Sequence, residues 1–261
     1  MAHHKRVPSV ARKSSVEVDI MREAGRIVAK VLAAVQEAAA PGVSTAELDR
    51  LAEQIIEGAE ASPSFKGYYG YPASICVEPE DVVVHGIPSE AEILGEGQIV
   101  GVDVGAIFHG YQADAAITFG IGKISAEKQR LMDVTLESLG AGIAAARAGN
   151  QLRDVSAAVQ ARAEAAGYGV VRDLVGHGIG RSMHEPPQVP NFVEEGQFVE
   201  YDLTLRTGHC LAIEPMINQG DWRVRQGRDG WTIRTADGLP TAHFEHTVAV
   251  TKDEPLILTL P

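Results

Sequence analysis

Two aspartates in a pair of apolar runs could do chemistry together. Asp103 lies in the run 100–107 and Asp114 in the run 111–119, and both runs alternate between two faces around a short turn at 108–110. This pattern predicts a β-hairpin. Because the midpoint of 103 and 114 falls in the turn, we expect the two acids to lie directly opposite each other, with Cβ atoms about 4.5–5.5 Å apart.

Two carboxylates at that distance would repel each other and resist ionisation. A metal ion between them would remove the repulsion, whereas the alternative is an exposed hairpin that carries two solvated acids. Gly101 and Gly105 share the face of Asp103. We expect them to leave the space that ions and their bridging water need.

A second pair of acids, Glu214 and Glu245, lies in the strand-like runs 211–217 and 244–250. Their midpoint falls on Asp229-Gly230, a dipeptide that favours a type I′ turn, although the long stretch between the runs must include a further excursion. Two hairpins would then bring four carboxylates to one site. Carboxylates suit hard divalent cations.

Three histidines could complete such a site. His177 is framed by glycines in the run GHGIG at 176–180, which allows close approach of the backbone; the alternative is a histidine in a surface turn. His184 and His85 would each, if taken alone, more often be packed than catalytic. Together with the four acids they form a set suited to metal-dependent hydrolysis.

A pair of helical patterns precedes each acidic hairpin. We expect helices over residues 16–40, 46–59, 124–147 and 151–166, with Ser44 or Thr45 capping the second. A shift of 107 residues places Pro41-Gly42 on Ala148-Gly149, which indicates an internal repeat. The sequence therefore predicts an α/β (α+β) protein with one catalytic domain at 16–261, in halves of about 16–122 and 123–252, after a flexible tail at 1–15.

Composition narrows the classes of protein. The chain is 45% hydrophobic and 22% charged, typical of a globular protein. No run approaches the roughly 18 apolar residues that span a membrane, and the polar N-terminus has no signal-peptide core, so we expect no membrane association and a cytoplasmic location. Cys76 and Cys210 form no CxxC pair and are expected to be free thiols.

The formal net charge of −12 argues against a general nucleic-acid binder. One basic strip near Trp222 and Trp231 is an exception, and it consists of Arg223, Arg225, Arg228 and Arg234. A solvated hairpin surface is the simpler interpretation of the strip. Contact with ribosomal RNA is the alternative.

The ordered motifs VVHGIP, VDVGAIFHGYQAD, GHGIGRSMHEPP, AIEPMI and AHFEHT resemble those of the type I methionine aminopeptidases. The resemblance runs from about residue 17 to 252. It includes the family's five metal ligands in order, which are here Asp103, Asp114, His177, Glu214 and Glu245. No long helical insertion interrupts the second half, which distinguishes the chain from the type II branch.

The resemblance implies the pita-bread fold, in which pseudo-twofold halves build an antiparallel sheet flanked by helices. It also implies two divalent ions per chain, with cobalt, manganese, iron(II), zinc and nickel as candidates. Asp103 would chelate one ion and His177 would bind the other, while Asp114 and Glu245 would bridge them. Glu214 would be a ligand that also handles the proton of the attacking water.

Other roles follow from the same resemblance. His184 would hydrogen-bond the scissile carbonyl oxygen or its oxyanion, and His85 would contact the second residue of the substrate. A methionine pocket would be formed by Phe65, Tyr68, Tyr71, Cys76, Met183 and Trp231. Phe65 and Met183 depart from the commonest family pattern, and the acidic segment 193–208 is longer than expected and would form a surface loop at the pocket rim.

The function implied is removal of the initiator methionine from nascent polypeptide N-termini when the second residue is small and uncharged. The enzyme would be a monomer, with possible ribosome contact through Arg223, Arg225 and Arg228. One alternative is a proline-specific aminopeptidase or prolidase, which shares the fold and ligands but usually carries a large additional N-terminal domain. Another is a catalytically inactive, ribosome-associated binding protein, a class that loses the ligands present here.

Overall fold

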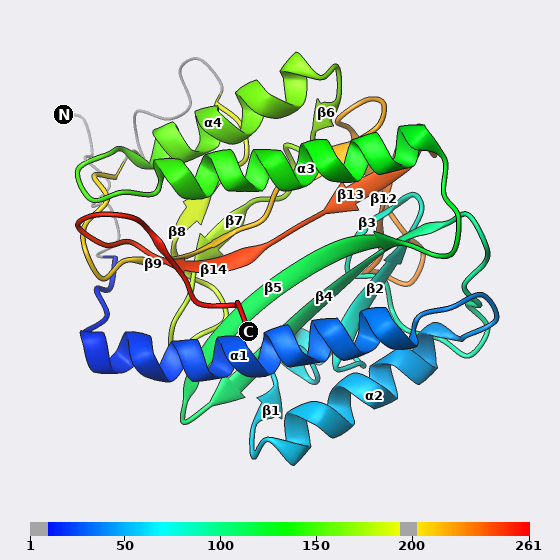
Figure 1. The fold of residues 1–261 in the computed structure, drawn as a ribbon, viewed down its shortest axis with the longest axis horizontal. Coiled ribbons are helices and arrows are strands. Elements are labelled where there is room, and N and C mark those ends of the chain that lie inside the picture. The colour runs from blue at the N-terminus through cyan, green and yellow to red at the C-terminus, as the bar shows by residue number, and fades with distance from the viewer. Residues whose placement is uncertain (1–9, 194–202) are drawn as a thin grey trace.

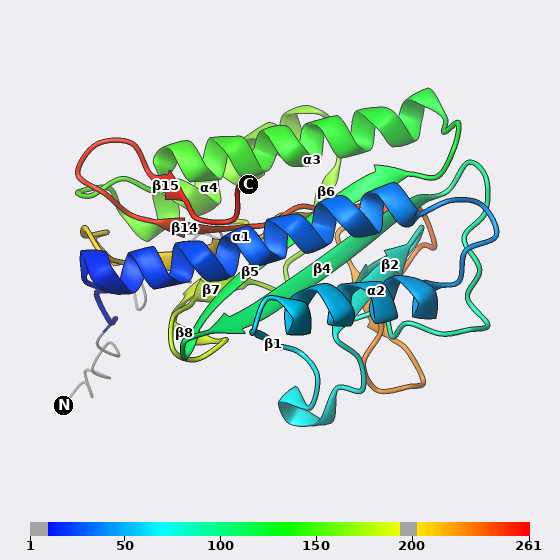
Figure 2. The same ribbon diagram turned by 60° about the horizontal axis from the view of Figure 1, so that its bottom comes forward.

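Two pairs of helices lie across a curved set of antiparallel strands. The computed structural model describes residues 10–193 and 203–261. Helices α1 (Ser15–Ala38) and α2 (Thr45–Gly58) belong to the first half, and α3 (Ala126–Ala145) and α4 (Leu152–Ala165) to the second. Both pairs cover the same side of the strands (Figures 1 and 2). Each helix matches its predicted range to within two residues.

The second helices of the two halves have the spacing of the predicted internal repeat, which itself stays a prediction. α2 and α4 are both 14 residues long and begin at Thr45 and Leu152, 107 residues apart. The glycines before them, Gly42 and Gly149, have φ of 94° and 100°, a left-handed conformation that glycine adopts without strain. Ser44 is the cap of α2, because its hydroxyl accepts from the Glu47 amide.

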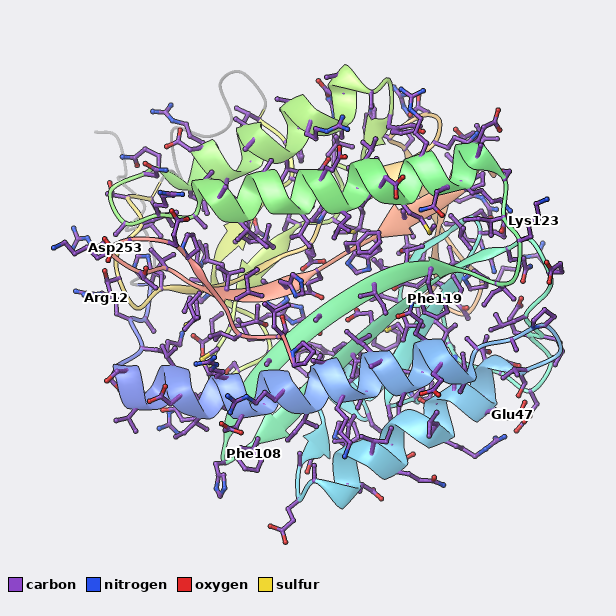
Figure 3. The ribbon with its side chains drawn as sticks, in the orientation of Figure 1. Arg12, Glu47, Phe108, Phe119, Lys123 and Asp253 are labelled. Atoms are coloured by element: carbon purple, nitrogen blue, oxygen red, sulfur yellow. The ribbon has the colours of Figure 1, made fainter. Side chains whose placement is uncertain are left out.

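The first acidic hairpin consists of β4 (Ile99–Phe108) and β5 (Tyr111–Gly120). Phe108 and Phe119 mark its two ends (Figure 3). The turn is His109-Gly110, and both residues have positive φ, as a type I′ turn requires. β1 (Ser62–Pro63) and β2 (Ile75–Pro79) pair with β4, which gives the order β1-β4-β2 with β5 beside β4.

The register of this hairpin corrects one prediction. Phe108 pairs with Tyr111, so Asp103 lies opposite Ala116 and Asp114 lies opposite Gly105. The acids are therefore not directly opposite each other, because the turn is centred one residue later than we expected. They are diagonal neighbours on one face, a separation that side chains can still span.

The second acidic hairpin is long and interrupted. Its strand pairs are β9 (Cys210–Ile213) with β14 (His246–Ala249), β10 (Met216–Asn218) with β13 (Thr241–His243), and β11 (Val224–Gln226) with β12 (Ile233–Thr235). All three registers are centred between residues 229 and 230, as the acid spacing predicted. The prediction of a type I′ turn is wrong, because that turn needs a positive φ at both central residues and Asp229 does not have one, although Gly230 does.

The remaining strands complete the sheets of the second half. These strands are β3 (Val82–Val84), β6 (Gly169–Val170), β7 (Gly176–Gly178), β8 (Glu185–Val189) and β15 (Leu256–Ile257). The sheet orders are β15-β14-β9-β7-β8, β13-β10-β6 and β11-β12-β3. β3 belongs to the first half in sequence, so its pairing with β12 ties the two halves together.

The core lies between the helices and one face of the strands. In the first half, the α1 side chains Val28, Val31 and Val35 pack in one cluster with Val102 and Val104 of β4. Burial of each such side chain contributes roughly 1.5–3 kcal/mol. Since side chains alternate along a strand, Asp103 points to the opposite face, away from the helices.

Threonine hydroxyls join the two halves at the seam between β5 and the second hairpin. The Thr247 hydroxyl accepts from the Asp114 amide at 2.9 Å and donates to the Asp114 carbonyl at 2.8 Å. In the same way, the Thr118 hydroxyl accepts from the His243 amide at 2.9 Å and donates to the His243 carbonyl at 2.7 Å. These bonds hold acids from distant parts of the sequence side by side.

The end of the predicted flexible tail is docked. Lys13 Nζ lies 2.5 Å from Glu185 Oε2, and the Arg12 side chain donates to the Thr207 carbonyl at 2.8 Å. The prediction of a flexible tail is wrong at these positions, because the Lys13 side chain is almost buried in its ion pair. Residues 1–9 of the tail lie outside the described residues. In the part of the chain that the structure describes, no helix is long and apolar enough to cross a membrane.

Candidate active site

The structure brings all of the predicted site residues to one cavity. The cavity has a volume of about 230 Å³. Its walls are Phe65, Tyr68, Tyr69, Tyr71, Cys76, His85, Asp103, Asp114, His177, Met183, His184, Glu214, Trp231 and Glu245. Among the described residues that line the cavity, Tyr69 alone was not a predicted site residue.

One cluster of potential metal ligands spans both halves of the fold. Asp114, His177 and Glu245 are buried, and one ligand atom of each lies within 4.8 Å of the others. Glu214 Oε1 lies 3.6 Å from His177 Nε2. Carboxylates from β5 and from the second hairpin therefore meet around one imidazole.

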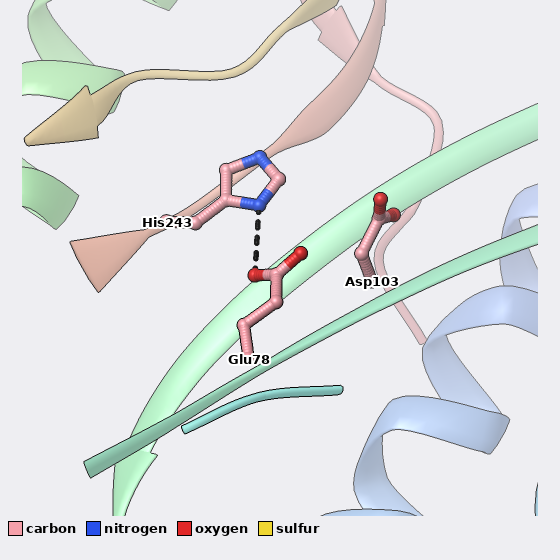
Figure 4. Close-up of side chains that lie close together, drawn as sticks. All are labelled: Glu78, Asp103 and His243. Atoms are coloured by element: carbon pink, nitrogen blue, oxygen red, sulfur yellow. Dashed lines mark hydrogen bonds and ion pairs between the residues drawn. The ribbon is translucent and has the colours of Figure 1, made fainter. Parts of the chain in front are cut away.

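A second cluster contains two residues that the sequence analysis missed. Glu78, Asp103 and His243 are buried with one ligand atom of each within 4.8 Å of the others (Figure 4). Glu214 lies between the two clusters, because its Oε2 is 3.9 Å from His243 Nε2. The alternation of side chains along a strand could have revealed them, because residues two positions apart point to the same face. Glu78 lies two residues after Cys76, and His243 lies two residues before Glu245.

The acids of the cavity hold their protons more tightly than usual. Burial, with repulsion from neighbouring acids, raises the pKa of Asp103 to about 7 and that of Glu214 to about 8. The same causes raise the pKa values of Asp114 and Glu245 well above the ordinary range. A buried cluster of this kind demands positive charge.

The histidines differ in protonation. Burial lowers the pKa of His177 to about 3 and also lowers the pKa of His184. The cavity walls desolvate His85 and lower its pKa to about 4, although the residue is exposed toward the cavity opening. Burial also lowers the pKa of His243, but the nearby carboxylates of Glu78, Asp103 and Glu214 have the larger, opposite effect. They raise the pKa of His243 to about 9, and Glu78 contributes most.

The His177 ring is oriented by the backbone of the next residue. Its Nδ1 lies 2.9 Å from the Gly178 carbonyl oxygen, so Nδ1 carries the proton and the neutral Nε2 is free to bind a cation. The framing glycines are required, since a Cβ at Gly176 or Gly178 would lie 2.4 or 2.3 Å from a backbone carbonyl oxygen. The expectation of close backbone approach is confirmed.

His184 is held by Tyr68. The Tyr68 hydroxyl lies 2.8 Å from His184 Nδ1, and the His184 ring packs edge-on against the His177 ring at 4.3 Å between centroids. His85 also lines the cavity and has a φ of 59°. A left-handed histidine is a sparsely populated conformation, and such strain clusters at functional sites.

Aromatic and sulfur-containing side chains form the apolar part of the cavity. Tyr71 and Trp231 contact each other edge to face at 5.2 Å between centroids, and Trp231 comes from the tip of the second hairpin. Cys76 pairs with Asp103 across β2 and β4, and burial raises the pKa of its thiol well above the ordinary value. Cys76 and Cys210 are both free, as predicted.

The role expected for Gly101 and Gly105 is corrected. A Cβ at Gly101 would lie 2.5 Å from Glu78 Oε2, and one at Gly105 would lie 2.9 Å from Phe65 Cε1 and 3.1 Å from Met183 Cε. The glycines therefore make room for protein side chains. Gly105 in particular lets the apolar wall close over β4.

The donor set fits divalent cations. Asp103 Oδ1, Asp114 Oδ1 and Glu245 Oε1 are buried and have no hydrogen-bond partner among the described residues. Buried polar atoms in folded proteins are nearly always satisfied, and a cation would satisfy all three oxygens at once. Carboxylate oxygens with imidazole nitrogens match cobalt, manganese, iron, zinc and nickel.

The basic strip is partly neutralised. Arg223 pairs with Asp221 at 2.7 Å, and Arg225 and Arg234 both pair with Asp81, at 3.5 and 2.5 Å. Arg228 is exposed at the hairpin tip. This arrangement agrees with the interpretation of the strip as a solvated hairpin surface.

The acidic segment 193–208 is described only in part. Its acids Glu194, Glu195, Glu200 and Asp202 lie outside the described residues. The segment's end is not surface loop, because Leu205 is buried in the core of the second half. Leu203 lines a second cavity together with His177 and His184.

Comparison with known proteins agrees with this geometry. The sequence profile of metallopeptidase family M24 matches residues 19–252. The chain belongs to metallopeptidase family M24. It is 50% identical over 248 residues to a methionine aminopeptidase of Clostridium acetobutylicum, an alignment that covers 95% of this chain and 98% of that protein.

Solved structures extend the comparison to the fold of this M24 peptidase. The crystal structure of methionine aminopeptidase from Thermotoga maritima superposes with a TM-score of 0.93 at 41% identity, covering 97% of this chain and all of that one. The prolidase of Pyrococcus furiosus superposes with a TM-score of 0.76 at 21% identity, covering 96% of this chain and 65% of that one. The pita-bread fold implied by the sequence motifs is confirmed.

Proposed function

We propose that this M24 peptidase removes the initiator methionine from nascent polypeptides whose second residue is small and uncharged. The observation that carries the proposal is the single cavity that holds the predicted acids, histidines and apolar residues together. Named relatives at 40–50% identity over nearly the whole chain are methionine aminopeptidases. The substrate would enter with its free amino group toward the acids and its side chain toward the apolar wall.

The acids and His177 would hold two divalent ions, with Asp103 in one cluster of ligand atoms and Asp114, His177 and Glu245 in the other. Bound ions supply Lewis acidity and lower the pKa of a bound water, so that it can act as a nucleophile near neutral pH. Glu214 lies beside both imidazoles. Its position suits it to take a proton from the nucleophile and to deliver it to the departing amine.

His184 and His85 act on the substrate directly. With Tyr68 donating to Nδ1, His184 keeps its proton on Nε2 and can donate it as a hydrogen bond to the scissile carbonyl oxygen, whose negative charge grows during attack. His85 stands at the cavity opening. There it would contact the backbone of the second residue and crowd out large side chains.

The apolar wall explains selection of methionine. Phe65, Met183 and Trp231 offer large, apolar and partly flexible surfaces, which suit an unbranched thioether. The cavity of about 230 Å³ would hold the methionine side chain beside the acids. Phe65 and Met183, the two departures from the common pattern, remain apolar and are expected to alter inhibitor preference more than turnover.

Peptide hydrolysis tests the proposal. The protein is stripped with a chelator, reloaded with Co²⁺, Mn²⁺ or Fe²⁺, and given Met-Ala-Ser, Met-Lys-Ser and an Xaa-Pro peptide. Release of methionine from Met-Ala-Ser alone, lost on chelation and restored by metal, is the expected result. Cleavage of the Xaa-Pro peptide would instead favour the prolidase function of the proteins that share the fold, and no cleavage of any peptide would favour an inactive binding protein.

Three further predictions belong to this proposal. The enzyme would act as a monomer in the cytoplasm, and it would meet its substrates at the ribosome through Arg223, Arg225 and Arg228. Exposure of Arg228 at the hairpin tip supports the last point. The ion pairs of Arg223 and Arg225 with aspartates weigh against it.

A further inference from the structure

Glu78 and His243 form a buried pair outside the predicted ligand set. Both are 2% exposed, and His243 Nδ1 lies 3.2 Å from Glu78 Oε2. Figure 4 shows the pair beside Asp103, with one ring nitrogen joined to Glu78 and the other on the far side of the ring. Two ionisable side chains without access to water are costly unless they have a task or a compensating partner.

The pair is incompletely satisfied in the protein alone. Among the described residues, Glu78 Oε1, Asp103 Oδ1 and His243 Nε2 are buried and have no hydrogen-bond partner. His243 Nε2 comes closest to Glu214 Oε2, at 3.9 Å, which is too long for a hydrogen bond. Each member of this cluster therefore has one unused donor or acceptor atom, and the cluster's ligand atoms lie within 4.8 Å of one another.

The arrangement matches the way proteins prepare a histidine for metal. A ligating imidazole usually donates its second N–H to a carboxylate, which fixes the tautomer and the ring orientation. Glu78 stands in this relation to His243 Nδ1, so Nε2 is the nitrogen left for a cation. The neighbouring cluster of Asp114, His177 and Glu245 has the same composition of two carboxylates and one imidazole.

We propose that Glu78 and His243 belong to the metal centre and that, with Asp103, they bind one divalent ion, with His243 Nε2 as its nitrogen ligand. This inference rests on the proposed metal-dependent function and adds residues to its ligand set. Each ion then receives one imidazole. Imidazole suits zinc, iron and nickel, whereas manganese prefers oxygen ligands. The second imidazole therefore shifts the metal preference of the centre away from manganese.

X-ray absorption on the full-length cobalt-loaded protein counts imidazole ligands directly. The number of metal-bound imidazoles per chain is the number per ion multiplied by the number of ions per chain. We expect about two in the wild type and about one in His243→Gln. His246→Gln is the matched control, because His246 belongs to the same stretch but hydrogen-bonds Thr259 at 2.8 Å and lies outside both clusters. It should leave the count unchanged.

Removing one member of a buried charged pair can unfold a protein, so a paired variant is also needed. Glu78→Gln with His243→Gln removes both charges of the pair together and should again show about one imidazole per chain. A wild-type count of about one, unchanged in these variants, would overturn the inference while methionine release persists. Loss of metal binding or of methionine release in the wild type itself would contradict the proposed function instead.

Discussion

Tyr68 offers a sharp test of how His184 is held. Its hydroxyl lies 2.8 Å from His184 Nδ1, and burial raises its pKa, so the phenol stays protonated and can donate. Tyr68→Phe removes this bond and keeps the ring in the cavity wall. A single hydrogen bond of this kind contributes about 0.5–1.5 kcal/mol, which corresponds to a fall in kcat of roughly 2- to 12-fold.

Steady-state hydrolysis of Met-Ala-Ser gives kcat and KM separately. Because the phenyl ring remains in place, KM should change little, whereas kcat should fall. Tyr69→Phe is the matched control, since Tyr69 is adjacent, is 86% exposed and also lines the cavity. It should retain wild-type kcat.

A double-mutant cycle separates positioning from packing. If Tyr68 acts through His184, then Tyr68→Phe should cost almost nothing once His184→Ala is present. His184→Ala alone should slow turnover by roughly 10²–10³-fold, the usual size for one oxyanion donor. Equal effects of Tyr68→Phe in both backgrounds would refute the reasoning.

Three further outcomes follow from the structure. Metal-free protein should lose thermal stability as pH rises from about 4 toward 8. The reason is that Asp103 and Glu214 have raised pKa values near 7 and 8, so the folded state binds their protons more tightly than the unfolded state does. Saturating Co²⁺ should abolish this pH dependence in calorimetry, and its persistence would contradict the fit of a cation to the site. Gly105→Ala should lower the free energy of unfolding by about 1–3 kcal/mol, measured by chemical denaturation, and should raise KM for methionine peptides. Gly140→Ala in α3 is the control, because no atom lies near the added Cβ, and it should leave the stability unchanged or increase it. Arg228→Glu should weaken ribosome cosedimentation at low salt, and unchanged cosedimentation would remove the ribosome contact from the proposal.

Much of the fold was readable because local signals agreed with one another. The helices had capping residues such as Ser44, apolar stripes and terminal glycines, and the repeat placed the second pair at the spacing of the first. The motifs then identified the acids and histidines of the cavity. The centre of the second hairpin was also correct, since strand alternation preserves register even across its interruptions at Glu214-Pro215 and at residues 244–245.

What the sequence did not reveal depended on geometry between distant segments. The turn is centred between residues 109 and 110 and not, as expected, between 108 and 109, and this difference makes Asp103 and Asp114 diagonal neighbours. Glu78 and His243 are 165 residues apart, and each reads in isolation as an ordinary polar residue in an apolar strand. Only the seam between the halves places them together beside Asp103.

That seam has a consequence for the life of the chain before it is complete. Asp114 and Thr247 are separated by 133 residues, and Thr118 and His243 by 125. During synthesis, the first hairpin must therefore wait for nearly the entire chain to leave the ribosome before its acids acquire their partners. At about 5–20 residues per second, a newly made molecule spends several seconds with an unfinished centre, so it cannot process its own N-terminus early and depends for that on an older copy of itself or on another enzyme.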